Sequence, residues 1–366
     1  MDNLFITPLT PHLHTTLKAR NPAWQQAFEQ LPLERADAIL VLNDGVHADG
    51  WISLWWQKIP EYHGDIAKRF NFGYASASCR QCWSTAKRAD NVTGIKVIGY
   101  KTAYIGTYNV PTPEMAQKLL THAEKMLRQQ GCGYVIAPVD GDTWHGYRLT
   151  TRLYDAPPFF LDRITPLEWN QHFTDAGFGC IANYASACAE ELDYSETAAP
   201  YWQEKFNSDP QYTLQPFDLE KTDAQLQELY ALSLQGFKDN FLYSDITQAE
   251  FVALYQPIIP FVVPELVQLA YIRGQLAAFA FAVPDYAQKA RGEEMDTLVL
   301  KTVVRHPAPE FKGLGAYLVW RMHQTAKAQG YRKLVTAFMH ENNVSLALSL
   351  KAGRIIREYA LYGKQL

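Results

Sequence analysis

Short apolar runs bounded by turn residues predict strands in both halves of the chain. In the first half, Ala38–Leu42 and Trp51–Trp56 flank an Asn-Asp-Gly turn signal and predict a hairpin. In the second half, Leu266–Ile272 and Gln275–Val283 flank an Arg-Gly turn and predict another hairpin. Further strands are predicted at Val97–Val110, Tyr134–Val139, Tyr212–Phe217, Asp296–Arg305, Leu334–Phe338 and Ile355–Tyr362.

Apolar residues at intervals of three and four predict the helices. The clearest helix begins at Thr112, a residue type that caps helices, has Pro113 in its first turn and ends before Gly131. Its apolar face consists of Met115, Leu119, Leu120, Ala123, Met126 and Leu127. Other helices are predicted at Pro166–Ala176, Ala224–Phe237, Thr247–Tyr255 and Val344–Lys351, and one runs from the turn Phe311–Ala316 to Gln329.

The order of predicted elements repeats in the two halves, which indicates a duplicated α/β fold. Between the halves, Ala189–Gln211 carries acids, Ser, Thr and two prolines without periodicity, as is typical of a linker. Residues 57–95 are polar and irregular and look like an inserted loop. We therefore expect two domains, at residues 1–195 and 211–366, joined by a linker at 196–210.

Composition and charge narrow the functional classes. Of the 366 residues 48% are apolar, and the net charge is −4 with no long run of Lys and Arg, which argues against a nucleic-acid partner. The longest apolar stretch, Leu276–Val283, is far shorter than the ~20 residues of a membrane-spanning helix, so we expect no membrane partner. The first residues lack the basic start and apolar run of a signal peptide, and cysteines are few. We expect a cytoplasmic protein.

The sharpest chemical signal is the turn PEFKGLGA at residues 309–316, between a predicted strand and a predicted helix. Glycines let the backbone turn tightly and expose its N–H groups, and the helix N-terminus adds the positive end of its dipole. Together they suit a pyrophosphate. The turn lacks the Gly-Lys-Ser/Thr of a Walker loop and the third glycine of a dinucleotide fingerprint.

From Glu265 onward the chain resembles the GNAT acyltransferase superfamily. The resemblance is carried by the hairpin Leu266–Val283, the strand Leu298–Arg305, the glycine turn and the sequence HENNVSLALSLKAGRIIREYALY. It implies that the turn holds the pyrophosphate of acyl-coenzyme A, in an Arg/Gln-x-x-Gly-x-Gly/Ala pattern that starts at Lys312 or at Glu310. The implied coenzyme-binding residues are Val303, Val304, Phe311, Lys312, Gly313, Leu314, Gly315, Ala316 and Asn342.

A narrower resemblance, to bacterial tandem GNAT-like proteins, covers nearly the whole chain. It is carried by Asn21-Pro22, Tyr104–Val110, Val135–Asp140, Pro157–Phe160, Ala176-Gly177-Phe178, Asn240, Ala282–Tyr286 and Arg357–Leu366. It implies two GNAT-like domains, each a mixed central sheet flanked by helices. In the first half the turn that corresponds to the glycine turn is Pro-Thr-Pro-Glu, and proline has no N–H to donate to a phosphate. We expect a degenerate first domain and one coenzyme site per chain.

Acyl transfer to an amine needs a neutral amine, a polarised thioester carbonyl and a proton for the leaving thiolate. The resemblance implies a tyrosine donor on the penultimate helix, in the pattern Asn-x-x-Ala-x-x-Leu-Tyr-x-Lys-x-Gly. Here Asn342 matches the Asn, but Ser349 stands at the tyrosine position. Candidate proton donors are therefore Ser349 and, on the last predicted strand, Tyr359 and Tyr362.

Two acids beside predicted strands, Asp285 and Asp296, are the candidate general bases. Asn240 and Tyr243 follow the first helix of the second half, a region that borders the acceptor in the GNAT fold, and are the candidate acceptor-binding residues. Cys79 and Cys82 have the spacing of a metal-ligand pair, but no second pair lies nearby, so we expect no metal.

The sequence predicts an enzyme that transfers an acyl group, acetyl above all, from coenzyme A to a small-molecule or peptide amine by direct attack. One alternative is a tandem-GNAT transferase that uses long-chain acyl-CoA or aminoacyl-tRNA, although the acidic balance argues against tRNA. The other is a non-catalytic protein that binds coenzyme A, which the serine at position 349 favours. His145 is interpreted as structural.

Overall fold

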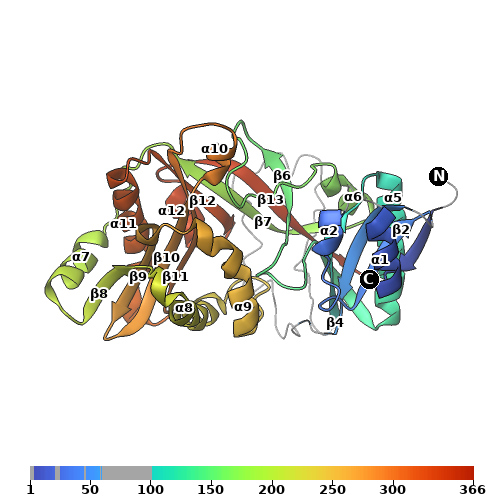
Figure 1. Ribbon diagram of the computed structural model, residues 1–366, viewed down its shortest axis with the longest axis horizontal. Coiled ribbons are helices and arrows are strands. Elements are labelled where there is room, and N and C mark those ends of the chain that lie inside the picture. The colour runs from blue at the N-terminus through green and yellow to red at the C-terminus, as the bar shows by residue number, and fades with distance from the viewer. Residues whose placement is uncertain (1–3, 21–24, 45–46, 58, 60–100) are drawn as a thin grey trace, which may run out of the picture. The chain divides into compact units, whose positions relative to one another are not determined.

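The computed structural model describes residues 4–20, 25–44, 47–57, 59 and 101–366, and the chain divides into two compact units (Figure 1). The first unit holds residues 1–152, 165–183 and 359–366, and the second holds 153–164 and 184–358. The predicted boundaries therefore miss two exchanges. The segment 153–164 leaves the first half of the chain for the second unit, and the last strand ends in the first unit.

The first unit is a mixed sheet in the order β1, β2, β3, β4, β5 and the end of β13. Its strands are β1 (Phe5–Pro8), β2 (Ala38–Asn43), β3 (Ala48–Trp55), β4 (Lys101–Asn109), β5 (Cys132–Ala137) and β13 (Arg354–Gln365), with β6 (Leu149–Leu153) also beside β13. All neighbours are antiparallel except β4 and β5, which are parallel. The helices are α1 (Pro11–Arg20), α2 (Gln25–Glu29), α5 (Pro113–Gln129) and α6 (Trp169–Asp175).

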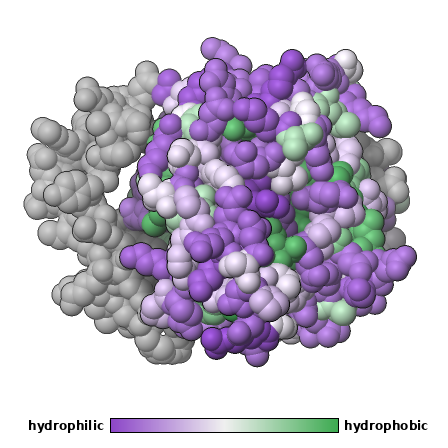
Figure 2. Space-filling view, turned by 90° about the vertical axis from the view of Figure 1, so that its left-hand side faces the viewer, coloured by the Kyte–Doolittle hydropathy of each residue, from purple (hydrophilic) through white to green (hydrophobic). Residues whose placement is uncertain are grey.

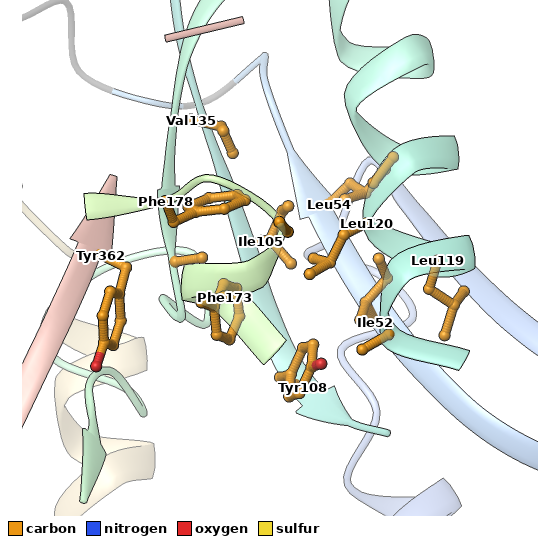
Figure 3. Packing of buried hydrophobic residues seen from close by; sticks show 14 of the residues in the cluster. Ile52, Leu54, Ile105, Tyr108, Leu119, Leu120, Val135, Phe173, Phe178 and Tyr362 are labelled. Atoms are coloured by element: carbon orange, nitrogen blue, oxygen red, sulfur yellow. The ribbon is translucent and has the colours of Figure 1, made fainter. Parts of the chain in front are cut away.

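Alternation along β2 gives the first unit a core on each face of its sheet. Leu40 and Leu42 pack into the larger core, with α5 and α6, whereas Ile39 and Val41 pack with Leu17 of α1. Figure 3 shows the larger core, in which the ring of Tyr362 from β13 stacks on Phe173 of α6 with centroids 5.8 Å apart. The last strand is thus part of the first unit's core.

The second unit is a mixed sheet in the order β7, β12, β11, β10, β9 and β8. The strands are β7 (Gly179–Ala189), β8 (Tyr212–Pro216), β9 (Val267–Ile272), β10 (Gln275–Pro284), β11 (Thr297–Arg305) and β12 (Lys333–His340). Only β11 and β12 are parallel. The helices are α7 (Ala199–Ser208), α8 (Thr222–Phe237), α9 (Gln248–Tyr255), α10 (Tyr286–Ala290), α11 (Leu314–Ala328) and α12 (Val344–Ser349). The predicted fold class, α/β with mixed sheet flanked by helices in each unit, is confirmed.

Helices α8 and α11 cover opposite faces of the second sheet. A Cβ built on Gly236 of α8 would lie 2.4 Å from Val304 Cγ1, and one built on Gly315 of α11 would lie 3.7 Å from Val303 Cγ1. Adjacent residues of a strand point to opposite faces, so the two helices lie on either side of β11. Glycine at position 236 is needed because α8 packs too closely on β11 for a side chain there.

Most of the predicted linker is helix α7. Ala199 and Trp202 are buried in the second core, and the Phe206 ring stacks on Tyr317 of α11 with centroids 5.5 Å apart. These residues recur at intervals of three and four, which is a helical pattern that the acids, Ser and prolines around them obscure. The surface on the α7 and β8 side is mostly hydrophilic (Figure 2), consistent with burial of these aromatic side chains.

A buried ion pair holds the exchanged segment 153–164 in the second unit. Arg357 and Asp162 have fully buried side chains, and Arg357 Nε lies 3.0 Å from Asp162 Oδ2. The same guanidinium donates to the carbonyl oxygen of Pro157 at 2.9 Å. The Phe160 N–H donates to Asp285 Oδ1 at 2.7 Å, and Phe159 packs on Phe338. Charge and aromatic packing together fix this segment on the second sheet.

Replacing Arg357 by Met is expected to lower the free energy of unfolding by about 3–5 kcal/mol, because Asp162 would keep a buried charge without its partner. The double variant Arg357→Met with Asp162→Leu removes both charges and is expected to be more stable than the single variant. Urea unfolding followed by tryptophan fluorescence measures both changes. A double variant as unstable as Arg357→Met would contradict the explanation by charge.

Candidate active site

Strands β11 and β12 pair in parallel only at their beginnings. The pairs run from Thr297 opposite Lys333 to Leu300 opposite Thr336. β11 nevertheless continues beside β10 as far as Arg305. The two parallel strands therefore separate toward their carboxyl ends, which is the edge where ligands of α/β sheets commonly bind.

Backbone donors of β11 point toward the place where the strands separate. The N–H of His306, directly after β11, donates to the carbonyl oxygen of Ala277 on β10 at 2.7 Å. N–H groups alternate sides along a strand, so those of Val303 and Arg305 point away from β10 and toward β12. β12 no longer pairs there, so these donors are accessible to a ligand. Polarisation of a carbonyl near Val303 stays a prediction, and this orientation favours it.

Helix α11 follows β11 and starts without a side-chain cap. A 3-10 turn at Pro309–Phe311 leads into Gly313, whose φ of +88° lies in the left-handed region that favours glycine. Gly313 supplies no capping side chain, so the first-turn N–H groups keep the positive end of the helix dipole. The contact between Gly315 and Val303 places this turn against the end of β11. The structure thus brings the predicted residues 311–316 and Val303 together.

Val304 has a different position from Val303. It is 2% exposed and lies opposite Phe279 of β10, with its side chain against α8. Val304 is therefore part of the core beneath the strand rather than of its open edge. Its role in coenzyme binding stays a prediction.

The place in the first unit that corresponds to this edge is closed by the chain itself. β4 and β5 also pair in parallel, but the Val139 N–H after β5 donates to the carbonyl oxygen of Ile105 at 2.8 Å. Asp140 Oδ1 accepts from the Thr107 N–H at 2.6 Å. A Cβ built on Gly106 would come within 2.2 Å of the Val139 carbonyl oxygen, so glycine permits this close approach. The backbone groups that would face a ligand are paired within the unit.

The helix that follows β4 is also capped. Thr112 Oγ1 accepts from the Met115 N–H at 3.3 Å, and Pro113 begins the helix without an N–H. An anion would therefore find fewer free donors at α5 than at α11. The Thr112 cap and the Pro113 position predicted from the sequence are confirmed.

The carboxyl end of β12 gathers several aromatic rings. Phe338 has a φ of +60°, rare for an aromatic residue, and its N–H donates to the Ser186 hydroxyl at 3.1 Å. Two residues on, the His340 ring lies 5.0 Å from the Tyr184 ring and 5.6 Å from the Phe241 ring. Non-glycine residues with positive φ cluster at functional sites.

Sequence reasoning missed His340. Its Nδ1 accepts the N–H of the predicted residue Asn342 at 3.1 Å, so the neutral ring carries its proton on Nε2 and can donate it in a hydrogen bond. Ser349 lies nearby on α12, with its hydroxyl 3.3 Å from the sulfur of Met339. The signal that could have found His340 is its place directly after a predicted strand and before Asn342.

The predicted acceptor region lies beside β12. Asn240 is exposed, and Phe241 contacts His340. The Tyr243 hydroxyl donates to Asp245 Oδ1 at 2.7 Å, and burial followed by this carboxylate raises the pKa of Tyr243. The loop after α8 therefore meets the same end of the sheet as the glycine turn.

Asp285 lies at the other end of β11. It caps α10, where its Oδ1 accepts the N–H groups of Phe160 and Ala287, and Pro284 before it pairs with Leu298 near the start of β11. Burial raises the pKa of the Asp285 carboxyl, although the two N–H donors act to lower it. These contacts give Asp285 a structural role: it caps α10 and holds the backbone at Phe160. Its role as a base stays a prediction that this position does not favour.

Asp296 also lies at the start of β11, among cations. Arg332 and Lys333 approach its Oδ2 at 2.9 and 3.7 Å, and Gln288 and Thr297 donate to its Oδ1. Burial acts to raise the pKa of Asp296, but these partners outweigh it and lower the pKa to about 2. A carboxylate held this strongly in its charged form is a poor base, so the structure does not favour the second prediction either.

Tyr359 and Tyr362 belong to the first unit. The Tyr362 hydroxyl donates to Asn170 Oδ1 at 2.8 Å, while Tyr359 is 2% exposed with the Arg148 guanidinium 5.5 Å from its ring centroid. Both rings therefore have packing partners within that unit. Their roles as proton donors stay predictions.

The remaining candidates from the sequence are Cys79, Cys82 and His145. Cys79 and Cys82 lie outside the described residues. Among the described residues, no group of three His, Cys, Asp or Glu side chains is placed to hold a metal ion. His145 Nδ1 lies 2.8 Å from Asp142 Oδ1 within one turn. No helix in the described part of the chain combines the length and apolar character needed to span a bilayer.

The chain is similar in fold to GCN5-related N-acetyltransferases, as the sequence resemblance predicted. One from Sphaerobacter thermophilus is 11% identical, with a TM-score of 0.48, and the match covers 100% of this chain and 96% of that one. A tandem GNAT protein from the clavulanic acid biosynthesis pathway is 12% identical, with a TM-score of 0.48 and coverage of 99% and 98%. L-PGS from Bacillus licheniformis is 15% identical, with a TM-score of 0.35 and coverage of 71% and 77%.

These likenesses concern the fold alone, and the functional argument rests on the geometry of the second unit. No protein-family model matches the chain, and no curated protein matches it.

The low pKa of Asp296 predicts a pH-dependent contribution to stability. Because the folded pKa is about 2 against a usual 3.8, the contribution is full above about pH 5 and is lost as the pH falls from about 4 to about 2. Asp296→Asn is therefore expected to destabilise the protein by about 2 kcal/mol at pH 6. Urea midpoints measured at pH 6 and pH 2.5 should show the gap to wild type closing.

Glu294→Gln is the matched control, because Glu294 also pairs with Arg332 but is largely exposed. Exposed ion pairs contribute little, so this variant should differ from wild type by less than about 1 kcal/mol at either pH. A gap for Asp296→Asn that does not change with pH would refute the explanation by charge.

Proposed function

We propose that the second unit is an acyl-CoA-dependent N-acyltransferase, which transfers an acyl group to an amine by direct attack. The observation that carries the proposal is the separation of β11 from β12 directly beside the uncapped start of α11. It supplies backbone donors for a carbonyl and for a pyrophosphate at the same edge of one sheet. Acetyl is the acyl group that we propose.

The residues at this edge fit coenzyme A. Gly313 adopts a left-handed conformation beside Ala198 and Trp202 of α7, and the nearest atom to a Cβ on Gly315 is Val303 Cγ1 at 3.7 Å, so the turn itself adds no side chain at these two positions. Lys312 is exposed in the same turn and adds a positive charge, while Glu310 adds a negative one. When bound, the coenzyme supplies an acyl thioester, whose carbonyl carbon is the electrophile.

Residues of the chain then polarise the thioester carbonyl and stabilise the leaving thiolate. The Val303 N–H donates to the thioester carbonyl oxygen as negative charge develops on it. The amine forms the new C–N bond, and the C–S bond breaks with its electron pair on sulfur. His340 Nε2–H donates a hydrogen bond to the departing thiolate, and the amine proton passes to solvent at this exposed end of β12. Asp285 and Asp296 lie at the opposite end of β11 and are not needed for either proton.

The acceptor is proposed to be a small-molecule or peptide amine. Asn240 and Tyr243 lie in the loop that brings Phe241 against His340, so an acceptor held by this loop would approach the end of β12. The rings of Phe241, Tyr184 and Phe338 favour an acceptor with an apolar portion next to the amine.

Calorimetric titration with acetyl-CoA is expected to show one binding site per chain, because the first unit pairs its own backbone groups and caps α5. Gly315→Asp is expected to weaken binding by at least about tenfold, because a carboxylate at the start of α11 repels the pyrophosphate. Gly179→Asp, at the exposed first residue of β7 with nothing within 4 Å of an added Cβ, is the control for a charge added elsewhere. A stoichiometry of two, or unchanged affinity in a folded Gly315→Asp variant, would overturn the assignment.

Ser349 is not expected to be the main proton donor, because a serine hydroxyl is far too weak an acid, whereas a thiolate with a pKa of ~8.5 leaves fairly readily. His340→Ala removes the hydrogen-bond donor to the developing thiolate and is expected to lower kcat by about 10²-fold, as the loss of one such donor does, whereas Ser349→Ala is expected to lower it by less than about tenfold. An amine-dependent thiol-release assay measures both, with Tyr359→Phe and Tyr362→Phe beside them.

The assay separates the remaining alternatives. A loss above 10²-fold in Ser349→Ala alone would contradict the assignment to His340, and a loss in a tyrosine variant would return the role to the last strand. Coenzyme binding with no thiol release from any amine tested would favour a non-catalytic protein.

A further inference from the structure

Helix α7 places one indole ring at the start of α11. Trp202 is 2% exposed, and its ring packs in the core of the second unit with Leu314 and Tyr317 of α11. The nitrogen edge of the ring faces Gly313, because a Cβ built on Gly313 would lie 3.2 Å from Trp202 Nε1 and 4.0 Å from its Cδ1. Glycine at this position leaves the indole nitrogen uncovered by a side chain of its own. The indole N–H therefore lies beside the first turn of α11.

The indole N–H of Trp202 is a donor without an acceptor. An indole nitrogen can only donate, and a donor taken out of bulk water needs a partner. Within the part of the chain that the structure describes, no hydrogen bond engages Trp202 Nε1, yet the atom is not fully enclosed. The ring nitrogen of Trp55 in the first unit, which also has no partner among the described residues, is enclosed. A ligand can therefore reach the N–H of Trp202 but not that of Trp55.

Backbone donors at the very start of α7 are occupied within the second unit. The Ala198 N–H donates to Glu196 Oε1 at 3.1 Å, and the Ala199 N–H donates to the Glu196 carbonyl oxygen at 3.1 Å. The next residue, Pro200, has no N–H. The Glu196 carboxylate is thus bound at the start of α7. The donor that α7 brings to the glycine turn is therefore the side chain of Trp202.

We propose that Trp202 donates its indole N–H to the pyrophosphate of acyl-coenzyme A, together with the backbone N–H groups at the start of α11. The inference rests on the proposed acyl-CoA function and adds to that site a residue from the segment between the two halves of the sequence. A phosphate group is the favoured acceptor, because its charged oxygens accept from several donors at once and suit the positive end of the α11 dipole. The uncharged pantetheine arm gains less from such a site.

Proton–nitrogen correlation spectra of the full chain, labelled at the indole nitrogens, test the contact directly. The chain has nine tryptophans, so the indole signals are few. The Trp202 signal is identified by its absence from Trp202→Phe or, if that variant does not fold, by nuclear Overhauser contacts with Gly313 and Ala198. CoA and inorganic pyrophosphate are each expected to move this signal downfield, because a hydrogen bond to a phosphate oxygen deshields the N–H proton. Pantetheine, which has no phosphate, is expected to leave it in place.

Two variants measure what the donor contributes. Trp202→Phe keeps an aromatic ring but removes the N–H, and it is expected to weaken CoA binding in calorimetric titration by about tenfold, because hydrogen bonds to charged groups are the stronger ones. The kcat/KM for acetyl-pantetheine, the same thioester without the phosphates, is expected to stay unchanged. Trp320→Phe is the matched control, since Trp320 is half-buried on α11 but stacks on Tyr317, and it is expected to bind CoA like the wild type.

The outcomes separate the inference from the function on which it rests. A Trp202 signal that CoA leaves in place, or unchanged CoA affinity in a folded Trp202→Phe variant, would overturn the contact and leave the acyltransferase proposal standing. Equal losses of kcat/KM for acetyl-CoA and acetyl-pantetheine in Trp202→Phe would indicate a distorted site and would overturn the contact as well. No binding of CoA to the wild-type chain would overturn both proposals.

Discussion

Parallel pairing between β11 and β12 stops after Leu300 and Thr336, and the chemistry proposed for the second unit depends on that separation. Buried backbone N–H and C=O groups need partners, so where two strands stop pairing other groups must supply the missing hydrogen bonds. One of these bonds comes from within the unit, because the Ser186 hydroxyl accepts the Phe338 N–H. The N–H of Val303 is left facing the other strand, beside the N-terminus of α11. A ligand that satisfies these donors thereby also gains an anion site.

The corresponding place in the first unit is occupied by the chain's own hydrogen bonds. Its parallel strands β4 and β5 are followed by Val139 and Asp140, which accept or donate the hydrogen bonds that a ligand would otherwise make. The close approach requires Gly106, and the cap at Thr112 removes the anion site. The first unit therefore keeps a mixed sheet but pairs its own backbone groups at the place where the strands of the second unit separate.

The exchanged segments explain why the two copies cannot be divided at one point in the chain. Residues 153–164 are held in the second unit by the buried pair of Arg357 and Asp162, and Phe159 packs on Phe338 at the strand that separates. In return, Tyr362 completes the core of the first unit through Phe173 and Asn170. Each unit thus needs a piece of chain from the other half of the sequence for its core.

The local pattern of the sequence determined the elements and the glycine turn at 309–316. Apolar runs bounded by turn residues defined β2, β3, β9 and β10, the Thr-Pro start defined α5, and the spacing of the glycines at 313 and 315 marked the turn before α11. These features depend on residues close together in the chain, which is why they can be read from it. The helix α7 was hidden because polar residues and prolines surround its few aromatic contacts.

Only the tertiary structure decided which residues meet. Asp285 and Asp296 carry the carboxyl group that a general base needs. Their hydrogen bond and ion pair near the start of β11, however, come from Phe160 and Arg332, which are brought close only by the fold. His340 gains its neighbours Tyr184 and Phe241 from distant segments. Where β11 and β12 part is likewise a matter of register between two strands whose paired residues are 36 apart in sequence, of the order that one crossover helix and its turns require. Short-range patterns fix elements, whereas contacts between distant segments fix the site.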